Sequence, residues 1–141
     1  MKVPFNYLPN QFKNNKIYFN EWKKLIKSCE FTLGSYVKKF ENNFSKFIGV
    51  KHCIATNSGT DALVLSLKSL GVKKNDEVIT VCNTFYSTVG AIIICGAKPV
   101  FVDCDERYQI CIDKIEKAIT KKTKIILPVH WGGASPNMKA I

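Results

Sequence analysis

The stretch Asn57-Ser58-Gly59-Thr60-Asp61-Ala62 separates a short apolar run, residues 52–56, from a leucine-rich segment that ends at Gly71. The run predicts a strand, and the segment predicts a helix through Leu63, Leu65, Leu67 and Leu70. Gly59 permits close backbone approach, Thr60 supplies a hydroxyl, and the N–H groups of a first helical turn carry partial positive charge. These features meet the physical requirement for holding a phosphate. Because Ser and Thr also begin many helices, a plain helix cap with nothing bound remains an equally open interpretation.

The alternation of short apolar runs and amphipathic segments continues to the last residue. It predicts strands at residues 77–81, 98–103 and 124–129, and helices at residues 85–95 and 112–119. Gly96 closes the first of these helices, and Ile112, Ile115 and Ile119 share one face of the second. Strand–helix–strand units of this kind build a parallel sheet with flanking helices, so the predicted fold class is α/β.

The residues before position 51 show a helical pattern without strands. The first 20 residues predict an irregular arm, and residues 21–28 predict a short amphipathic helix. Ser35 is the predicted N-cap of a second helix that ends at Gly49, with a core-facing stripe formed by Val37, Phe40, Phe44 and Phe47. We therefore predict an arm with two amphipathic helices at residues 1–50 and the first part of a larger α/β domain at residues 51–141.

A length of 141 residues with 46% hydrophobic and 23% charged residues is typical of a soluble globular chain. The longest apolar run, Val89–Cys95, is far shorter than the ~20 residues of a membrane-spanning helix. Residues 1–6 lack the apolar core of a secretory signal. We therefore predict a cytoplasmic protein without a membrane partner.

The net charge of +10 would favour a nucleic-acid partner if it formed a patch. However, Arg107 is the only arginine, and the lysines stand singly or in pairs. Arginine is the residue that most often binds phosphates and base edges, through two parallel hydrogen bonds of its guanidinium group. We therefore interpret the charge as a solvated surface and predict no nucleic-acid partner.

The six cysteines include no C-x-x-C pair, and no histidine lies at ligand spacing from them. We therefore predict no metal site. Most of the cysteines stand among Val, Ile and Ala, so we interpret them as small buried thiols.

Ligands of open parallel sheets bind beyond the carboxyl ends of the strands, so the other strand exits are also candidate sites. Phe85 could stack on a planar heterocycle, although aromatic residues at helix starts commonly pack in the core. Asp103, Asp105 and Glu106 offer carboxylates, for which turn formation is the commoner role. His130 could act as an acid or base, although a lone histidine is more often structural.

Six groups of residues occur in the order found in one enzyme family: Phe31-Thr32-Leu33-Gly34; Ser58-Gly59-Thr60-Asp61-Ala62-Leu63; Gly71-Val72 with Asp76-Glu77-Val78-Ile79-Thr80; Thr84-Phe85; Gly96-Ala97-Lys98-Pro99-Val100-Phe101-Val102-Asp103; and Pro128-Val129-His130. In these motifs, from about residue 20 to the last residue, the chain resembles the DegT/StrS family of nucleotide-sugar aminotransferases. The resemblance implies the large domain of a fold-type I transferase dependent on pyridoxal 5'-phosphate (PLP). In this chain the domain would be an incomplete, mostly parallel sheet with flanking helices.

The resemblance also implies roles for individual residues. Gly59, Thr60 and Asp61 would form the cup for the PLP phosphate, and the ring of Phe85 would cover the pyridine face. His130 matches the family pattern without a defined role. The implied reaction is the transfer of an amino group from an amino acid, commonly glutamate, to a keto group of a nucleoside-diphosphate sugar by a homodimer.

The family's Schiff-base lysine, and the aspartate that pairs with the pyridine nitrogen, would lie beyond Ile141. We therefore predict an N-terminal fragment that contains no catalytic residue and is inactive alone. Two further functions stay open: a nucleotide-sugar 3-dehydratase of the same family, in which another residue replaces the lysine, and a non-catalytic regulatory or binding protein on the same scaffold. A generic nucleotide-binding domain is the weakest alternative, because no glycine-rich fingerprint is present.

Overall fold

The structure is a computed structural model that describes residue 3 and residues 5–141. Met1, Lys2 and Pro4, which belong to the stretch predicted to lack a secretory signal, lie outside the described residues. The chain divides into two compact units, Met1–Ala55 (unit 1) and Thr56–Ile141 (unit 2). The boundary that the sequence suggests, between residues 50 and 51, stays a prediction. No helix in the described part of the chain is long and apolar enough to cross a bilayer.

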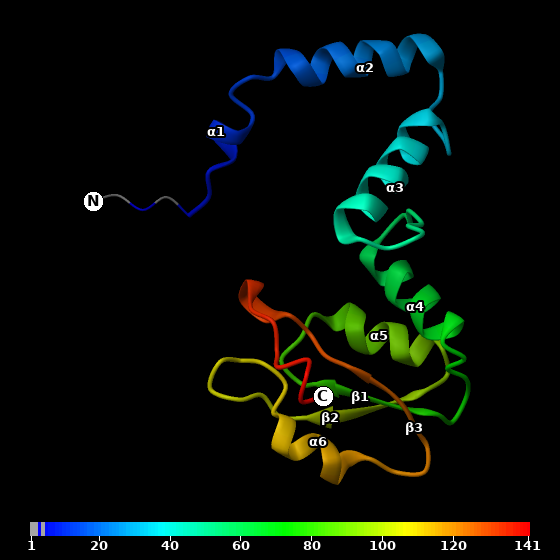
Figure 1. The fold of residues 1–141 in the computed structure, drawn as a ribbon, viewed down its shortest axis with the longest axis vertical. Coiled ribbons are helices and arrows are strands. Elements are labelled where there is room, and N and C mark those ends of the chain that lie inside the picture. Colours follow the sequence, from blue (N-terminus) through cyan, green and yellow to red (C-terminus); the bar gives the residue numbers. More distant parts are fainter. Residues whose placement is uncertain (1–2, 4) are drawn as a thin grey trace. The chain divides into compact units, whose positions relative to one another are not determined.

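The described residues of unit 1 form three helices: α1 (Leu8–Gln11), α2 (Lys16–Ser28) and α3 (Ser35–Ile48) (Figure 1). The prediction of an irregular arm up to residue 20 is therefore wrong. Pro9 lies in the first turn of α1, where its fixed φ and missing N–H are tolerated. The predicted end of α3 is confirmed, because Gly49 adopts a φ of 78° and closes the helix.

A tight turn joins α2 to α3. Cys29 and Leu33 have positive φ values of 55° and 51°, and a Cβ on Gly34 would come within 2.7 Å of the Glu30 Cβ. The Glu30 carboxylate accepts hydrogen bonds from the Ser35 hydroxyl and from the Ser35 N–H, the latter at 3.0 Å, and these bonds lower the pKa of Glu30. Ser35 is the first residue of α3 and Gly34 is its N-cap, so the prediction of Ser35 as the cap is wrong by one residue.

The phenylalanine stripe of α3 is exposed. Phe40, Phe44 and Phe47 are 54%, 43% and 83% exposed, and Ser45 is the only buried residue of the helix. Phe40 and Phe44 stack on each other with ring centroids 5.5 Å apart. The interpretation of the stripe as core is therefore wrong for this structure, because the described residues leave these rings uncovered.

Unit 2 is built around a three-stranded parallel sheet with the strand order β2-β1-β3 (Figure 1). The strands are β1 (Glu77–Val81), β2 (Lys98–Val102) and β3 (Thr123–Leu127), and each begins within one residue of its predicted start. The helices are α4 (Gly59–Ser69), α5 (Tyr86–Ile94) and α6 (Ile112–Ala118), close to the predicted ranges. The α/β class with a parallel sheet and flanking helices is confirmed.

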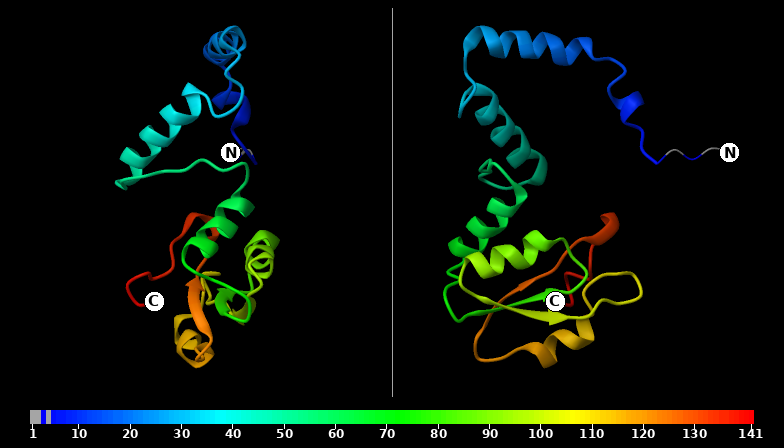
Figure 2. Two further views of the ribbon diagram at one scale, coloured as in Figure 1. Left: turned by 90° about the vertical axis from the view of Figure 1, so that its right-hand side faces the viewer. Right: turned by 180° about the vertical axis from the view of Figure 1, so that it is seen from behind.

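Helices cover both faces of this sheet, and successive residues of β1 therefore pack against different helices. Val78 packs in one apolar cluster with Ile92 of α5 and residues of α4. Ile79 and Val81 pack in a second cluster with Ile115 of α6. Figure 2 shows α5 and α6 on opposite sides of the sheet. Every residue of β1 is buried, including the polar Glu77 and Thr80, whose side chains make hydrogen bonds to Thr120 and to the Leu127 carbonyl.

Residues 52–56 form no strand, although the sequence predicts one there. A strand requires a hydrogen-bonded neighbour, and the strands in the described part of the chain pair only in the order β2-β1-β3. The backbone of this segment instead finds a side-chain partner, since the Ala55 N–H donates to Glu41 Oε1 at 2.8 Å. The prediction of a strand is therefore wrong for this structure.

Candidate functional site

Helix α4 begins with a reciprocal cap. The Asp61 N–H donates to Ser58 Oγ at 3.0 Å, and the Ser58 hydroxyl donates to Asp61 Oδ2 at 2.7 Å. The Asp61 carboxylate lies in the first turn, where the helix dipole favours negative charge. The two capping side chains therefore fix the backbone of Gly59 and Thr60, which lie between them.

The N–H groups of Gly59 and Thr60 make no hydrogen bond among the described residues, whereas the Ala62 N–H donates to the Ser58 carbonyl at 3.0 Å. A Cβ placed on Gly59 would meet no heavy atom within 4 Å. The start of α4 thus presents two free donors to open space at the positive end of a helix. An anion such as a phosphate can bind there.

A hydroxyl–hydroxyl hydrogen bond connects the starts of α4 and α5. Thr60 Oγ1 donates to Ser87 Oγ at 2.8 Å, and Ser87 is buried. The Ser87 hydroxyl keeps its own proton for a further acceptor. Because α5 follows β1, this contact places the first turn of α4 at the carboxyl edge of the sheet, where ligands of such sheets bind. Ser87 was not among the predicted site residues, because its only signal in the sequence is a hydroxyl near the start of a helix at a strand exit.

Phe85 is the N-cap residue of α5, and its side chain is 61% exposed. The alternative that Phe85 packs in the core is therefore wrong. Its ring contacts that of Tyr86, with centroids 4.2 Å apart. The structure thus brings Gly59, Thr60 and Phe85 to one edge of the sheet, where an exposed aromatic ring can stack on a planar group bound beside it.

The acidic residues after β2 organise their own loop. The Lys114 ammonium donates to Asp103 Oδ2 at 3.0 Å and lowers the pKa of Asp103. Asp105 Oδ1 accepts the N–H groups of Gln109, at 3.0 Å, and of Arg107, at 2.9 Å, and these bonds lower the pKa of Asp105. Both carboxylates therefore serve the turn, the commoner role. Within the described residues, no group of three or more His, Cys, Asp or Glu side chains is arranged to hold a metal ion.

The chain leaves β3 through a 3-10 turn, η1 (Trp131–Gly133), directly after His130. His130 is exposed and makes no hydrogen bond within the part of the chain that the structure describes. Gln109, which is only 1% exposed, donates through its side-chain Nε2 to the Trp131 carbonyl at 3.0 Å. Gln109 was not among the predicted site residues, because a single polar residue beside a turn forms no recognisable sequence pattern.

All six cysteines are free thiols, but none is fully buried. Cys29 and Cys82 are exposed and the other four are half-buried, so the interpretation as buried thiols is wrong. Cys82 is the first residue after β1 and emerges at the sheet edge, where its Sγ lies 3.8 Å from Asp103 Oδ1.

Known proteins resemble this chain over most of its length. The model of the DegT/DnrJ/EryC1/StrS aminotransferase family matches residues 13–141. A pleiotropic regulatory protein of Geobacillus stearothermophilus is 41% identical over 143 residues, which cover 100% of this chain and 38% of that protein. A dTDP-3-amino-3,4,6-trideoxy-alpha-D-glucose transaminase of Micromonospora megalomicea subsp. nigra is 43% identical over 120 residues, which cover 84% of this chain and 32% of the relative.

Solved structures share the fold. The crystal structure of ntda from Bacillus subtilis with bound cofactor PMP has a TM-score of 0.91 and 38% identity, covering 99% of this chain and 33% of the other. The E. coli GDP-4-keto-6-deoxy-D-mannose-3-dehydratase with bound hydrated PLP has a TM-score of 0.82 and 30% identity, covering 89% of this chain and 34% of the other. The chain thus spans about a third of the length of the proteins it matches. Because the family model matches nearly the whole chain, and the fold agrees with these structures, the chain belongs to the DegT/DnrJ/EryC1/StrS aminotransferase family.

Proposed function

We propose that the protein containing this chain binds PLP at the carboxyl edge of the sheet and transfers an amino group from an amino acid, most simply glutamate, to a keto group of a nucleoside-diphosphate sugar. We further propose that it acts as a cytoplasmic homodimer. The observation that supports this best is the meeting, at one sheet edge, of the free N–H groups of Gly59 and Thr60 with the exposed ring of Phe85. Membership of an aminotransferase family supports PLP as the phosphate-bearing ligand of this edge.

The residues at this edge fit PLP, which joins a phosphate to a flat pyridine ring. Gly59 and Thr60 would donate their N–H groups to the phosphate, and the Ser87 hydroxyl offers a further proton. Phe85 would cover one face of the ring. Asp61 would contribute through the cap with Ser58, because its own N–H is already bonded.

When bound, PLP supplies an electron sink for a carbanion formed from the amino acid. The residues of this chain contribute binding and orientation. The donors at the start of α4 would hold one end of the cofactor, while Phe85 would fix the plane of the ring and exclude water from one face. His130 follows β3, which pairs in parallel with β1, so it lies at the same edge as the residues that follow β1.

A sugar 3-dehydratase is the second candidate function. The 30% identity to the E. coli dehydratase with bound hydrated PLP favours it, because one phosphate cup would serve both reactions. A non-catalytic regulator is the third, favoured by the 41% identity to the Geobacillus regulatory protein.

The test is to purify the full-length protein, record its absorption spectrum with and without added PLP, and incubate it with glutamate and 4-keto or 3-keto sugars of dTDP, UDP and GDP. Mass spectrometry should detect a sugar in which an amino group replaces the keto oxygen. Loss of a sugar hydroxyl without gain of nitrogen would instead establish the dehydratase. A protein that binds no PLP would contradict both enzymatic functions.

A further inference from the structure

Gln109 lies in the loop between β2 and α6, and the local backbone directs its side chain inward. The loop is closed by an antiparallel bridge between Cys104 and Ile110, and the Asp105 N–H donates to the Gln109 carbonyl at 2.8 Å. Tyr108 adopts a positive φ of 62° and is exposed, whereas the next residue, Gln109, is buried. A polar side chain of this size is thus placed in the core next to the exit of β3.

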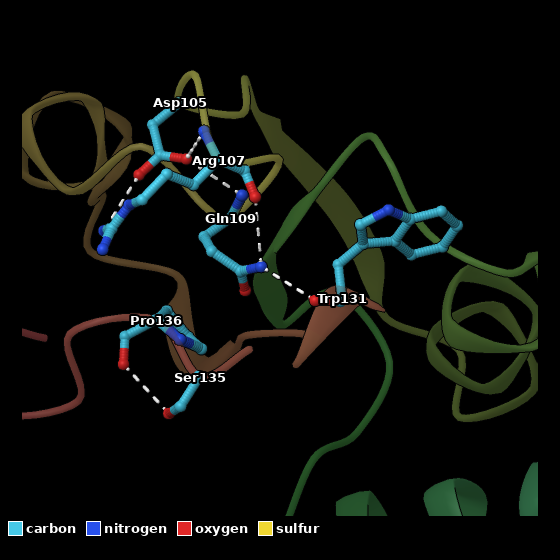
Figure 3. Close-up of polar contacts among 6 residues, drawn as sticks. All are labelled: Asp105, Arg107, Gln109, Trp131, Ser135 and Pro136. Atoms are coloured by element: carbon cyan, nitrogen blue, oxygen red, sulfur yellow. Dashed lines mark hydrogen bonds and ion pairs between the residues drawn. The ribbon is translucent and has the colours of Figure 1, made fainter. Parts of the chain in front are cut away.

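The Gln109 amide bridges two loops. Its Nε2 donates to the Trp131 carbonyl at 3.0 Å and to the Arg107 carbonyl at 3.3 Å (Figure 3). The Trp131 carbonyl also accepts the Ala134 N–H at 3.1 Å. Among the described residues, the bond to Trp131 is the only side-chain hydrogen bond between the loop after β2 and the turn after β3.

The two halves of the Gln109 amide are used unequally. Both of its partners are carbonyl oxygens, so the NH2 group must face them, and the opposite oxygen, Oε1, is buried without a hydrogen-bond donor in the described structure. A buried acceptor without a donor lowers stability. An apolar residue of similar size would avoid that penalty, so what Gln109 contributes here is its two N–H bonds.

The turn after β3, which receives the bond to the Trp131 carbonyl, is intrinsically flexible. Gly132 and Gly133 have φ values of 61° and 81°, and glycine loses more conformational freedom on ordering than any other residue. A fixed geometry for this turn therefore depends on bonds such as those to the Trp131 carbonyl. The position of His130, immediately before the turn, depends on the same backbone geometry.

We propose that Gln109 is a positioning residue whose buried amide fixes the turn at residues 130–133 and thereby holds His130 at the sheet edge where the cofactor would bind. The fixing of the turn stands on the hydrogen bonds alone. The placing of His130 for catalysis rests on the proposed function.

The first test is hydrogen–deuterium exchange of the full-length protein, read in peptides that cover residues 128–136. Gln109→Leu should raise exchange at the turn by about tenfold, the effect of losing one ordinary hydrogen bond, while peptides from α5 stay unchanged. Gln11→Leu, in the exposed helix α1, is the matched control and should change neither. Exchange in Gln109→Leu equal to that of the unmodified protein would overturn the proposal.

The second test uses the charge that Gln109→Glu introduces. At pH 8 its carboxylate would face the carbonyls of Arg107 and Trp131 and repel them, whereas at pH 5 its protonated form could donate one hydrogen bond. The other charged or titratable side chains of the two loops are present in both variants and in the unmodified protein: Asp103, Cys104, Asp105, Glu106, Arg107, Tyr108, Cys111 and His130. Exchange at the turn, relative to the unmodified protein, should therefore fall as the pH falls for Gln109→Glu and stay constant for Gln109→Leu. A constant ratio for both would contradict the proposed role of the N–H donors.

The third test measures amination by the same variants. If His130 is positioned through Gln109, kcat of Gln109→Glu relative to the unmodified enzyme should recover as the pH falls, in parallel with the exchange, while kcat of Gln109→Leu stays low. A changed exchange with unchanged kcat would refute the positioning of His130. If the unmodified protein neither binds PLP nor aminates, the proposed function fails, and the exchange measurements still decide whether Gln109 fixes the turn.

Discussion

Units 1 and 2 both carry many apolar residues but use them differently. In unit 2, Val78, Ile79 and Ile92 are completely buried between the sheet and its helices. In unit 1, α2 has no buried residue, and Trp22 and Phe47 are 61% and 83% exposed. An amphipathic pattern therefore predicts a helix but does not reveal what covers it, whereas alternating strands and helices supply their own partners. The candidate site lies entirely in the unit that has its own core.

The largest expected effect tests this difference in burial. Ile79→Ala in the full-length protein should lower the free energy of unfolding by about 3 kcal/mol, because it removes buried atoms and leaves a cavity. Phe47→Ala should change it by about 0.5 kcal/mol or less, as expected for an exposed side chain. Urea denaturation of both variants measures the difference. An equal loss in the two variants would show that the stripe of α3 is covered in the complete protein and would break the comparison.

The next expected effect is on PLP affinity and leaves the free energy of unfolding nearly unchanged. Gly59→Val should weaken PLP binding by about tenfold or more, since the added side chain would occupy the space through which the phosphate approaches two N–H donors. The free energy of unfolding should stay nearly constant, because no heavy atom lies within 4 Å of the new Cβ. Equilibrium titration with PLP measures the first quantity and urea denaturation the second.

Gly90→Val is the matched control for this variant. Gly90 also has no heavy atom within 4 Å of a placed Cβ, but it lies in the middle of α5, away from the first helical turn. PLP affinity should therefore stay unchanged in Gly90→Val. Equal weakening in both variants would remove Gly59 from the site.

The sequence predicted unit 2 well because its signals are local. Strand β1 occupies the predicted residues 77–81, where the β-branched run Val78–Val81 follows Asp76 and Glu77. The strand predicted at residues 52–56 has a similar pattern but forms no ladder, since pairing depends on a neighbour that local pattern does not specify. The start of α2 at Lys16 was missed for a related reason, because few strong signals mark a helix start without a side-chain cap.

The site was predicted only in part. Glycine and hydroxyl residues at a strand exit pointed to Gly59 and Thr60, and the resemblance to a family pointed to Phe85. Ser87 and Gln109 escaped, because each depends on a contact between distant segments: 27 residues separate Thr60 from Ser87, and 22 separate Gln109 from Trp131. Polar side chains of this kind become recognisable only when the fold brings their partners together.

A smaller effect on binding separates the aromatic residues of the two units. Phe85→Ala should weaken PLP binding by about 1–3 kcal/mol if the ring stacks on the cofactor as aromatic residues stack on nucleobases. Phe47→Ala, which removes an even more exposed ring from unit 1, should leave PLP affinity unchanged. Fluorescence titration with PLP measures both. Unaltered affinity in Phe85→Ala would show that the exposed ring at the start of α5 has another role.

The smallest expected effect is a loosening of one turn in each unit as the pH falls. The direction is the same in both units, but the loosening should extend to a second turn only in unit 2. Hydrogen bonds from the Gln109 and Arg107 N–H groups lower the pKa of Asp105, and those from Ser35 lower the pKa of Glu30. A carboxyl with a lowered pKa in the folded state stabilises that state above its unfolded pKa of about 4, and this contribution is lost as the pH falls through the folded value. Acid should therefore loosen both turns, and carboxyl NMR titration should find both groups below their ordinary values.

The acid-induced loosening should extend further from Asp105 than from Glu30. Asp105 accepts the backbone N–H of Gln109, and the buried side-chain amide of Gln109 donates to the Trp131 carbonyl. Protonation of Asp105 should therefore raise hydrogen exchange in the turn after β3. Protonation of Glu30 should affect only the first turn of α3. Asp105→Asn keeps an oxygen that can accept the same N–H bonds but cannot titrate, so it should abolish the acid step at the β3 turn and leave that of α3 intact. Persistence of the step in Asp105→Asn would show that another group controls this turn.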